Sequence, residues 1–235
     1  FTREYAKAHR EELEQVYQLV ADDWSRKVLQ NVVEYKLSGE IRLLRACESN
    51  PREAWENILK PSTEEHYMDL GAYTGDTIAE FIGYAGEWRR ITALEPDPVT
   101  FAKLERNTAG LHDCILYRLG AYSRYARLPF AGGAGRGSHL AAGGAMTELD
   151  SVDNILCGQT VSLINMDVEG MEAEAIAGMA KTLRRHRPKL LIAGYHRSED
   201  LWRLPLEVLA IQPEYKVYVR HYPCLPAWDV NFYFV

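Results

Sequence analysis

The sequence has few of the residues that would indicate a metal cluster, a disulfide framework or a membrane. Its cysteines are far apart and form no Cys-x-x-Cys pair; they are Cys47, Cys114, Cys157 and Cys224. This spacing predicts neither a structural zinc site nor a set of disulfides, and it fits a reducing, cytoplasmic location. No apolar run approaches the roughly 20 residues of a membrane-spanning helix, so we expect no membrane partner.

Clusters of basic residues are also missing. The chain of 235 residues carries 27 Lys and Arg against 33 Asp and Glu, a formal net charge of −6, and its basic residues are scattered. A protein that binds a nucleic-acid backbone presents a concentrated basic surface, so no nucleic-acid partner is expected. With 47% hydrophobic and 26% charged residues, the composition is that of an ordinary globular protein with one main core.

The N-terminal region differs in periodicity from the rest of the chain. In residues 1–60, Leu13, Val16 and Val20 recur at helical spacing among charges, and Asn50 before Pro51 is typical of a helix start. We expect about three helices here, forming a helical cap. Residues 61–235 are expected to form the main domain.

Short apolar runs alternate with helical stretches from residue 61 onward, which predicts a parallel sheet with crossover helices. The predicted strands are 67–70, 91–95, 114–119, 161–168, 189–196, 215–221 and 229–235. The predicted helices are 76–86, 98–108, 172–186 and one that begins at residue 199. The Gly- and Ala-rich stretch 129–150 predicts an irregular excursion rather than a sheet strand.

The turn in "YMDLGAYTGDT", residues 67–77, predicts a cofactor site. A dinucleotide fingerprint would need glycines where the chain has Tyr73 and Asp76, and a phosphate loop would need a Gly-Lys-Ser/Thr ending. Gly71 and Gly75 permit a close approach of the backbone. An acid at the helix start suits a positively charged cofactor without phosphate, such as S-adenosylmethionine. The alternative is an ordinary strand–helix turn, with Asp76 favoured by the helix dipole.

The next predicted strand ends at Glu95, 24 residues after Gly71. An acid about 20 residues after the glycine turn binds the ribose hydroxyls in Rossmann-like sheets. Glu95 has a second interpretation, as an ordinary helix-start acid followed by the turn-forming Pro96. The cofactor-sized spacing between the two features favours the ribose interpretation.

Four ordered segments of the chain resemble the FkbM-type methyltransferases, a branch of the class I S-adenosylmethionine-dependent enzymes. These segments are "DLGAYTGDT", "ALEPDPVTFAKLERN", "INMDVEGMEAEAIAGM" and "RPKLLIAGYHRSEDLWRLP". The resemblance spans about residues 67–235. It implies an α/β, Rossmann-like fold with a seven-stranded, mainly parallel sheet, helices on both faces and a reversed last strand.

The same resemblance implies S-adenosylmethionine as the cofactor and assigns residues to it. The positions that match the family's cofactor motifs are Asp69, Gly71, Ala72, Gly75 and Thr77 for the methionine part, and Glu95, Pro96 and Asp97 for the ribose and adenine side. Tyr73 stands where many members have Asn, and an aromatic face near a sulfonium is favourable. With the acid Asp76, these positions form the expected cofactor site.

Three further residues lie at the carboxyl ends of predicted strands, where open α/β sheets bind their ligands. Asp167 and Glu169 flank Val168, the last residue of the strand 161–168, and His196 ends the strand 189–196. We expect them to be catalytic, with His196 as the base, because neutral imidazole is the usual proton acceptor near pH 7, and with Glu169 second. Glu172 and Glu174 fall in the next helix's first turn, where the helix dipole stabilises acids.

Other interpretations of these three residues stay open. His196 is alternatively a loop histidine fixed by backbone bonds. Asp167 and Glu169 are alternatively ligands of a divalent metal that would lower the pKa of a substrate hydroxyl. Because the sequence shows no clear third ligand, we predict no metal.

Together these observations predict an S-adenosylmethionine-dependent methyltransferase that methylates a hydroxyl of a sugar or small secondary metabolite. The expected partner is a small-molecule or glycan acceptor, and a homo-oligomer is compatible with the sequence. One alternative is a nicotinamide-dependent Rossmann oxidoreductase, which the glycines missing at 73 and 76 disfavour. Another is a cofactor-binding protein without catalysis, which the presence of Asp167, Glu169 and His196 disfavours.

Overall fold

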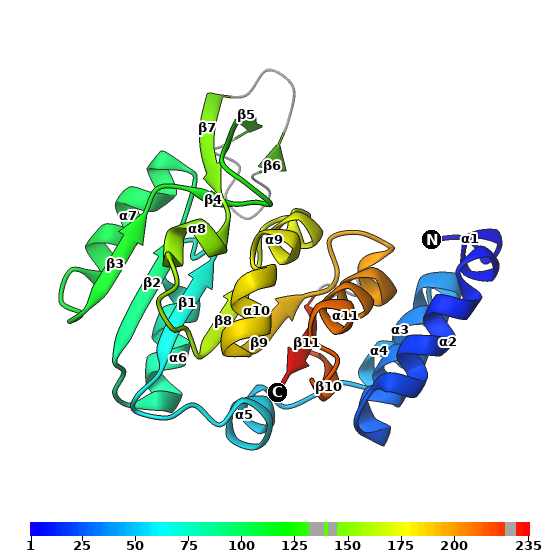
Figure 1. The fold of residues 1–235 in the computed structure, drawn as a ribbon. Coiled ribbons are helices and arrows are strands. Elements are labelled where there is room, and N and C mark those ends of the chain that lie inside the picture. The colour runs from blue at the N-terminus through cyan, green and yellow to red at the C-terminus, as the bar shows by residue number, and fades with distance from the viewer. Residues whose placement is uncertain (132–138, 141–144, 224–228) are drawn as a thin grey trace. The chain divides into compact units, whose positions relative to one another are not determined.

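The computed structural model describes residues 1–131, 139–140, 145–223 and 229–235 (Figure 1). Its main sheet has seven strands in the order β10-β11-β9-β8-β1-β2-β3. They are β1 (His66–Leu70), β2 (Arg90–Leu94), β3 (Cys114–Tyr117), β8 (Leu163–Met166), β9 (Lys189–Ala193), β10 (Val217–His221) and β11 (Val230–Phe234). Strand β1 is parallel to β2 and β8, β2 is parallel to β3, and β11 is antiparallel to β9 and β10. The predicted α/β class and seven-stranded, mainly parallel sheet with a reversed strand are confirmed.

Two compact units make up the chain. One comprises residues 1–60 and 190–235, and the other comprises residues 61–189. The expected division into a segment 1–60 and a domain 61–235 stays a prediction, as does the role of the N-terminal helices as a cap.

The unit of residues 61–189 is built around the central strands β1 and β8. All side chains of both strands are buried, as expected for parallel strands covered on both faces. Helices α6 (Asp76–Ala85) and α7 (Pro98–Thr108) follow β1 and β2. The rings of Tyr67 in β1 and Phe81 in α6 stack with centroids 4.2 Å apart, so α6 packs against β1.

The helix predicted for residues 172–186 is wrong in one respect, because the chain forms two helices here. They are α9 (Glu172–Gly178) and α10 (Ala180–His186). A Cβ on Gly178 would lie 2.0 Å from the carbonyl oxygen of Tyr122. Glycine is therefore required for this close backbone approach, and it is also a poor helix former.

The prediction of an irregular excursion over residues 129–150 is wrong for the part that the structure describes. A second sheet of order β4-β7-β5-β6 contains β4 (Gly120–Ala121), β5 (Ala126–Ala131), β6 (His139–Leu140) and β7 (Ala145–Asp150). Figure 1 shows β5 and β7 side by side, and they pair antiparallel. The numerous glycines and alanines, which are poor strand formers, concealed the strand residues at both ends of this stretch. Residues 132–138 and 141–144 lie outside the described part.

The other unit begins with a series of helices. They are α1 (Arg3–Ala8), α2 (Arg10–Leu19), α3 (Asp23–Ser38), α4 (Ile41–Arg45), α5 (Pro51–Glu53) and the π-helical η1 (Ala54–Leu59), and α11 (Asp200–Ile211) follows β9. Asn50 caps α5 by accepting a hydrogen bond from the N–H of Arg52 at 3.0 Å, which confirms the predicted helix start. Among the described residues, no helix is both long and apolar enough to span a bilayer.

A buried arginine of β10 joins the N-terminal helices to the strands of the same unit. The side chain of Arg220 is 3% exposed and pairs with Asp22 at 2.8 Å and Glu53 at 2.9 Å. Its Nη1 also donates to the hydroxyl of Ser25 at 3.0 Å. Because Asp22 and Ser25 stand at the start of α3, the guanidinium fixes this helix to β10.

We expect Arg220→Met to destabilise the protein by about 2–4 kcal/mol, since it leaves partly buried carboxylates without their cation. The measurement is the free energy of unfolding in denaturant. Arg203→Met is the matched control, because Arg203 forms an exposed i,i+4 pair with Glu207 at 2.7 Å and should cost less than about 1 kcal/mol. Equal losses in the two variants would contradict this account.

Candidate cofactor site

The turn between β1 and α6 is fixed by backbone hydrogen bonds. The N–H groups of Gly71 and Ala72 donate to the carbonyl of Leu94 at 3.0 and 2.9 Å, and the N–H of Gly75 donates to Ala72 at 2.8 Å. Gly71 and Gly75 have φ angles of 86° and 90°, which glycine adopts without strain. At Gly71 a Cβ would lie 1.9 Å from the carbonyl oxygen of Asp167. Only glycine fits at this position.

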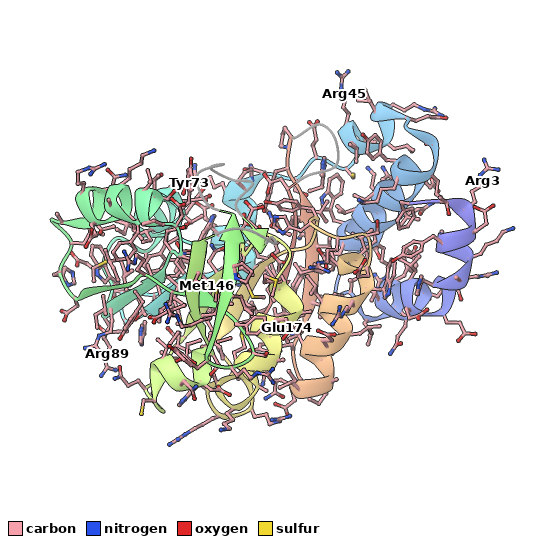
Figure 2. All side chains as sticks on the ribbon, turned by 90° about the horizontal axis from the view of Figure 1, so that it is seen from above. Arg3, Arg45, Tyr73, Arg89, Met146 and Glu174 are labelled. Carbon is pink, nitrogen blue, oxygen red and sulfur yellow. The ribbon has the colours of Figure 1, made fainter. Side chains whose placement is uncertain are left out.

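Tyr73, labelled in Figure 2, belongs to the same turn and has a φ of 48°. A bulky residue in this left-handed region is strained, and such strain persists only where the surroundings fix the backbone. One fixing contact comes from Asn107 of α7, whose Nδ2 donates to the carbonyl of Thr74 at 2.8 Å. Nothing in the sequence spacing of Asn107 links it to the turn, so this contact cannot be predicted from the sequence.

Glu95 follows β2 and is 7% exposed. Its Oε2 accepts a hydrogen bond from the N–H of Tyr73 at 3.0 Å, and its Oε1 accepts one from the N–H of Asp97 at 2.8 Å. Each carboxylate oxygen keeps a second lone pair, so the group has the acceptors that two neighbouring hydroxyls require. The pKa of Glu95 is raised to about 7, because the effect of burial outweighs that of the two backbone donors, which lower the pKa.

The residues after Glu95 have local structural partners. The Oδ1 of Asp97 accepts hydrogen bonds from the N–H groups of Val99 at 3.0 Å and Thr100 at 2.8 Å, and so caps α7. Pro96 packs near Gly120, since a Cβ added to this glycine would lie 3.7 Å from the Cβ of Pro96. Direct contacts of Pro96 and Asp97 with a cofactor stay predictions.

Asp69 lies in β1 beneath the turn and is fully buried. Its Oδ1 accepts a hydrogen bond from Asn165 Nδ2 at 2.9 Å, and its Oδ2 accepts one from Thr77 Oγ1 at 2.5 Å. The pKa of Asp69 is raised to about 6, because the effect of burial outweighs that of these two donors, which lower the pKa. Asp69 and Thr77 therefore bind each other inside the protein, whereas Asp76 is exposed in the first turn of α6.

The loop after β8 carries the two predicted catalytic acids. Glu169 and Gly170 have φ angles of 54° and 91°, so Glu169 is another non-glycine residue in the left-handed region. Glu172 is 1% exposed. Its Oε1 accepts hydrogen bonds from the N–H groups of Val168 at 3.1 Å and Gly170 at 3.3 Å. Glu172 thus holds the loop of Asp167 and Glu169, a role beyond the interaction with the helix dipole that its position in the first turn of α9 predicts.

His196 belongs to the other unit and lies three residues after the end of β9. It is half-buried, and its ring centroid lies 4.3 Å from that of Tyr195. The catalytic roles of His196, Asp167 and Glu169 stay predictions.

Residues 69–218 match the family model of the methyltransferase FkbM domain. The chain belongs to this family. A crystal structure of methyltransferase FkbM from Methylobacillus flagellatus KT is 27% identical with a TM-score of 0.86, and the match covers 98% of this chain and 60% of that one. The chain thus spans less than two thirds of the length of that methyltransferase. A search of curated proteins gave no match.

Two more distant solved structures share the fold alone. Fibrillarin from Aeropyrum pernix, with natively bound S-adenosyl-L-methionine, is 13% identical with a TM-score of 0.50, covering 78% of this chain and 71% of that one. An rRNA methylase from Streptococcus thermophilus is 12% identical with a TM-score of 0.52, covering 79% of this chain and 96% of that one. The predicted Rossmann-like methyltransferase fold is confirmed.

Family membership assigns S-adenosylmethionine as the cofactor, as predicted. The residues at the turn fit this group. Glu95 offers acceptors for a ribose diol, and the turn of Gly71 and Gly75 allows a close backbone approach. The acid Asp76 at the start of α6 suits a cationic cofactor and would repel a phosphate. The nicotinamide alternative receives no support.

Because burial raises the pKa of Glu95 to about 7, we expect cofactor binding to depend on pH. The ionised carboxylate accepts the ribose hydroxyls, so binding releases a proton below pH 7 and the affinity falls as the pH falls, by up to about tenfold per unit. Glu95→Gln should weaken binding at pH 8 by about 1.5–3 kcal/mol and flatten the profile between pH 6.5 and 8. Titration calorimetry with S-adenosylhomocysteine measures both.

Glu105→Gln is the control for this experiment, since Glu105 is an exposed glutamate of α7. It should bind S-adenosylhomocysteine like the unchanged protein at every pH. If Glu95→Gln behaved like this control, the ribose would have to be bound elsewhere.

Proposed function

We propose that this FkbM-family protein transfers the methyl group of S-adenosylmethionine to a hydroxyl oxygen of a sugar or small secondary metabolite. The observation that carries the proposal is the close approach of two loops. The carbonyl of Asp167 occupies the space that a side chain at residue 71 would need. The loop with Asp167 and the strained Glu169 therefore adjoins the cofactor turn, where groups that act on an acceptor are needed.

Bound S-adenosylmethionine supplies a methyl group activated by a sulfonium. In the proposed reaction the chain's own residues bind, align and deprotonate. Glu95 binds the ribose, and the turn of Gly71 and Gly75 holds the methionine part. His196 accepts the proton of the acceptor hydroxyl at a ring nitrogen while the oxygen forms its bond to the methyl carbon and the methyl–sulfur bond breaks, which leaves S-adenosylhomocysteine; Glu169 is the second candidate base. Alignment and exclusion of water supply much of the rate enhancement.

The charge of the protein supports a small-molecule or glycan acceptor over a nucleic acid. A net charge of −6 repels a phosphate backbone, which would need a concentrated basic surface. The rRNA methylase relative shares only the fold, and a fold does not fix the substrate. A cytoplasmic location is part of the proposal, and a homo-oligomer is compatible with it.

The test is a panel of sugars and hydroxylated metabolites, each assayed for formation of S-adenosylhomocysteine. With an accepted substrate, we expect His196→Ala to lower turnover by about 10²–10⁴, the usual contribution of a positioned base. Affinity for S-adenosylhomocysteine should stay unchanged. His112→Ala is the matched control, since His112 is exposed and precedes β3.

Three results would change this proposal. Normal turnover by His196→Ala would move the base to Glu169, to be tested with Glu169→Gln. Loss of turnover with a chelator, restored by Mg²⁺, would favour a metal held by Asp167 and Glu169. Cofactor binding without turnover of any acceptor would favour a binding protein without catalysis.

A further inference from the structure

A polar pair crosses the two most buried strands of the sheet. Asp69 of β1 and Asn165 of β8 are partners in the parallel register of these strands. They are 0% and 5% exposed, in strands whose other side chains are all buried as well. Burial of an amide and a carboxylate is unfavourable unless each finds hydrogen-bond partners. Two apolar residues would fill these positions with a lower desolvation cost, which indicates that the polar pair of Asp69 and Asn165 has a function.

The pair extends into helix α6. Asn165 Nδ2 donates to one oxygen of Asp69 at 2.9 Å, and Thr77 Oγ1 donates to the other. Thr77 lies in the first turn of α6, whose N-cap is Gly75, a residue without a capping side chain. Asp69 therefore supplies a side-chain anchor for the start of this helix, and Asn165 fixes Asp69 in turn.

Strand β8 also reaches the predicted catalytic loop. Two residues after Asn165, the N–H of Asp167 donates to the carbonyl of Leu70 at 3.0 Å, and the carbonyl of Asp167 adjoins Gly71. The register of Asn165 with Asp69 thus sets how β8 meets the cofactor turn as well.

We infer that Asn165 is a positioning residue of the cofactor site, which acts through Asp69 to fix the start of α6 and thereby the turn 71–75. Asn165 itself is not assigned any contact with the cofactor. The inference rests on the cofactor assignment and is independent of the proposed acceptor. Its failure in a binding assay would leave the proposed O-methylation untouched.

A positioning role differs from a purely structural one in its pH signature. Burial already raises the pKa of Asp69 to about 6, and loss of the amide donor raises that pKa further. The titratable groups that interact with Asp69 are Tyr67 of β1, Asp76 of α6 and Glu95 after β2. From β8, the residue that contacts Asp69 is the uncharged Asn165. Without this amide, Asp69 becomes protonated at a higher pH, and its hydrogen bond with Thr77 is altered at that pH.

The experiment measures the affinity for S-adenosylhomocysteine between pH 5.5 and 8 in Asn165→Leu. We expect binding at pH 7 to weaken by about 10- to 100-fold, the range for a hydrogen bond to a charged group. We also expect the affinity to begin its fall at a higher pH than in the unchanged protein. Asn154→Leu is the matched control, since Asn154 Nδ2 donates to Asp150 at 2.9 Å in an exposed pair; it should alter neither property.

A second pair of variants keeps the shape of the site. Asn165→Asp places two carboxylates in contact and should weaken binding, whereas the double variant Asp69→Asn with Asn165→Asp restores a donor and an acceptor and should bind more tightly than Asn165→Asp alone. These variants replace Asn165→Leu if that protein does not fold. Unchanged affinity and pH profile in the folded single variants, or a double variant no better than Asn165→Asp, would overturn the inference.

Discussion

The buried carboxylate of Asp69 is the constraint on which the rest of the site depends. A charge in the centre of a sheet is tolerated only when side chains donate hydrogen bonds to it. Asp69 obtains these bonds from Thr77 of α6 and Asn165 of β8. One strand, the helix that follows it and a strand whose contact residue lies 96 positions later in the chain are thereby joined at a single group. The turn between β1 and α6 has little freedom left, which pre-organises it for a ligand.

Around this anchor, the cofactor site consists mainly of backbone placed by a few side chains. Glu95 orients the N–H groups of Tyr73 and Asp97, and Glu172 does the same for the loop after β8. Both acids are almost fully buried. The carboxylate of Glu95 is a good acceptor for a ligand because it does not have to give up bulk water, and its raised pKa couples binding to a proton.

The sequence predicted the parts whose signal is local. Runs of apolar residues located β1 and β2 within a residue, and helix α7 over 98–108 matches its capping sequence Asp97-Pro98. Prediction from the sequence failed where a structural feature depends on a contact between residues that are far apart in the chain. The requirement for glycine at 178, beside the break at Met179, depends on the backbone of Tyr122, and the importance of Asn165 depends on its register with Asp69. Neither register nor close backbone approach can be derived from the spacing of residues.

The central claim is that the turn 71–77 and Glu95 bind S-adenosylmethionine. Thermal unfolding with excess ligand tests it most directly. At about 100 times the dissociation constant, linkage gives about 2.7 kcal/mol, which for a chain of this length is a rise in Tm of about 5–10 °C. This account predicts that rise with S-adenosylmethionine or S-adenosylhomocysteine and none with NAD. A rise with NAD alone would contradict it.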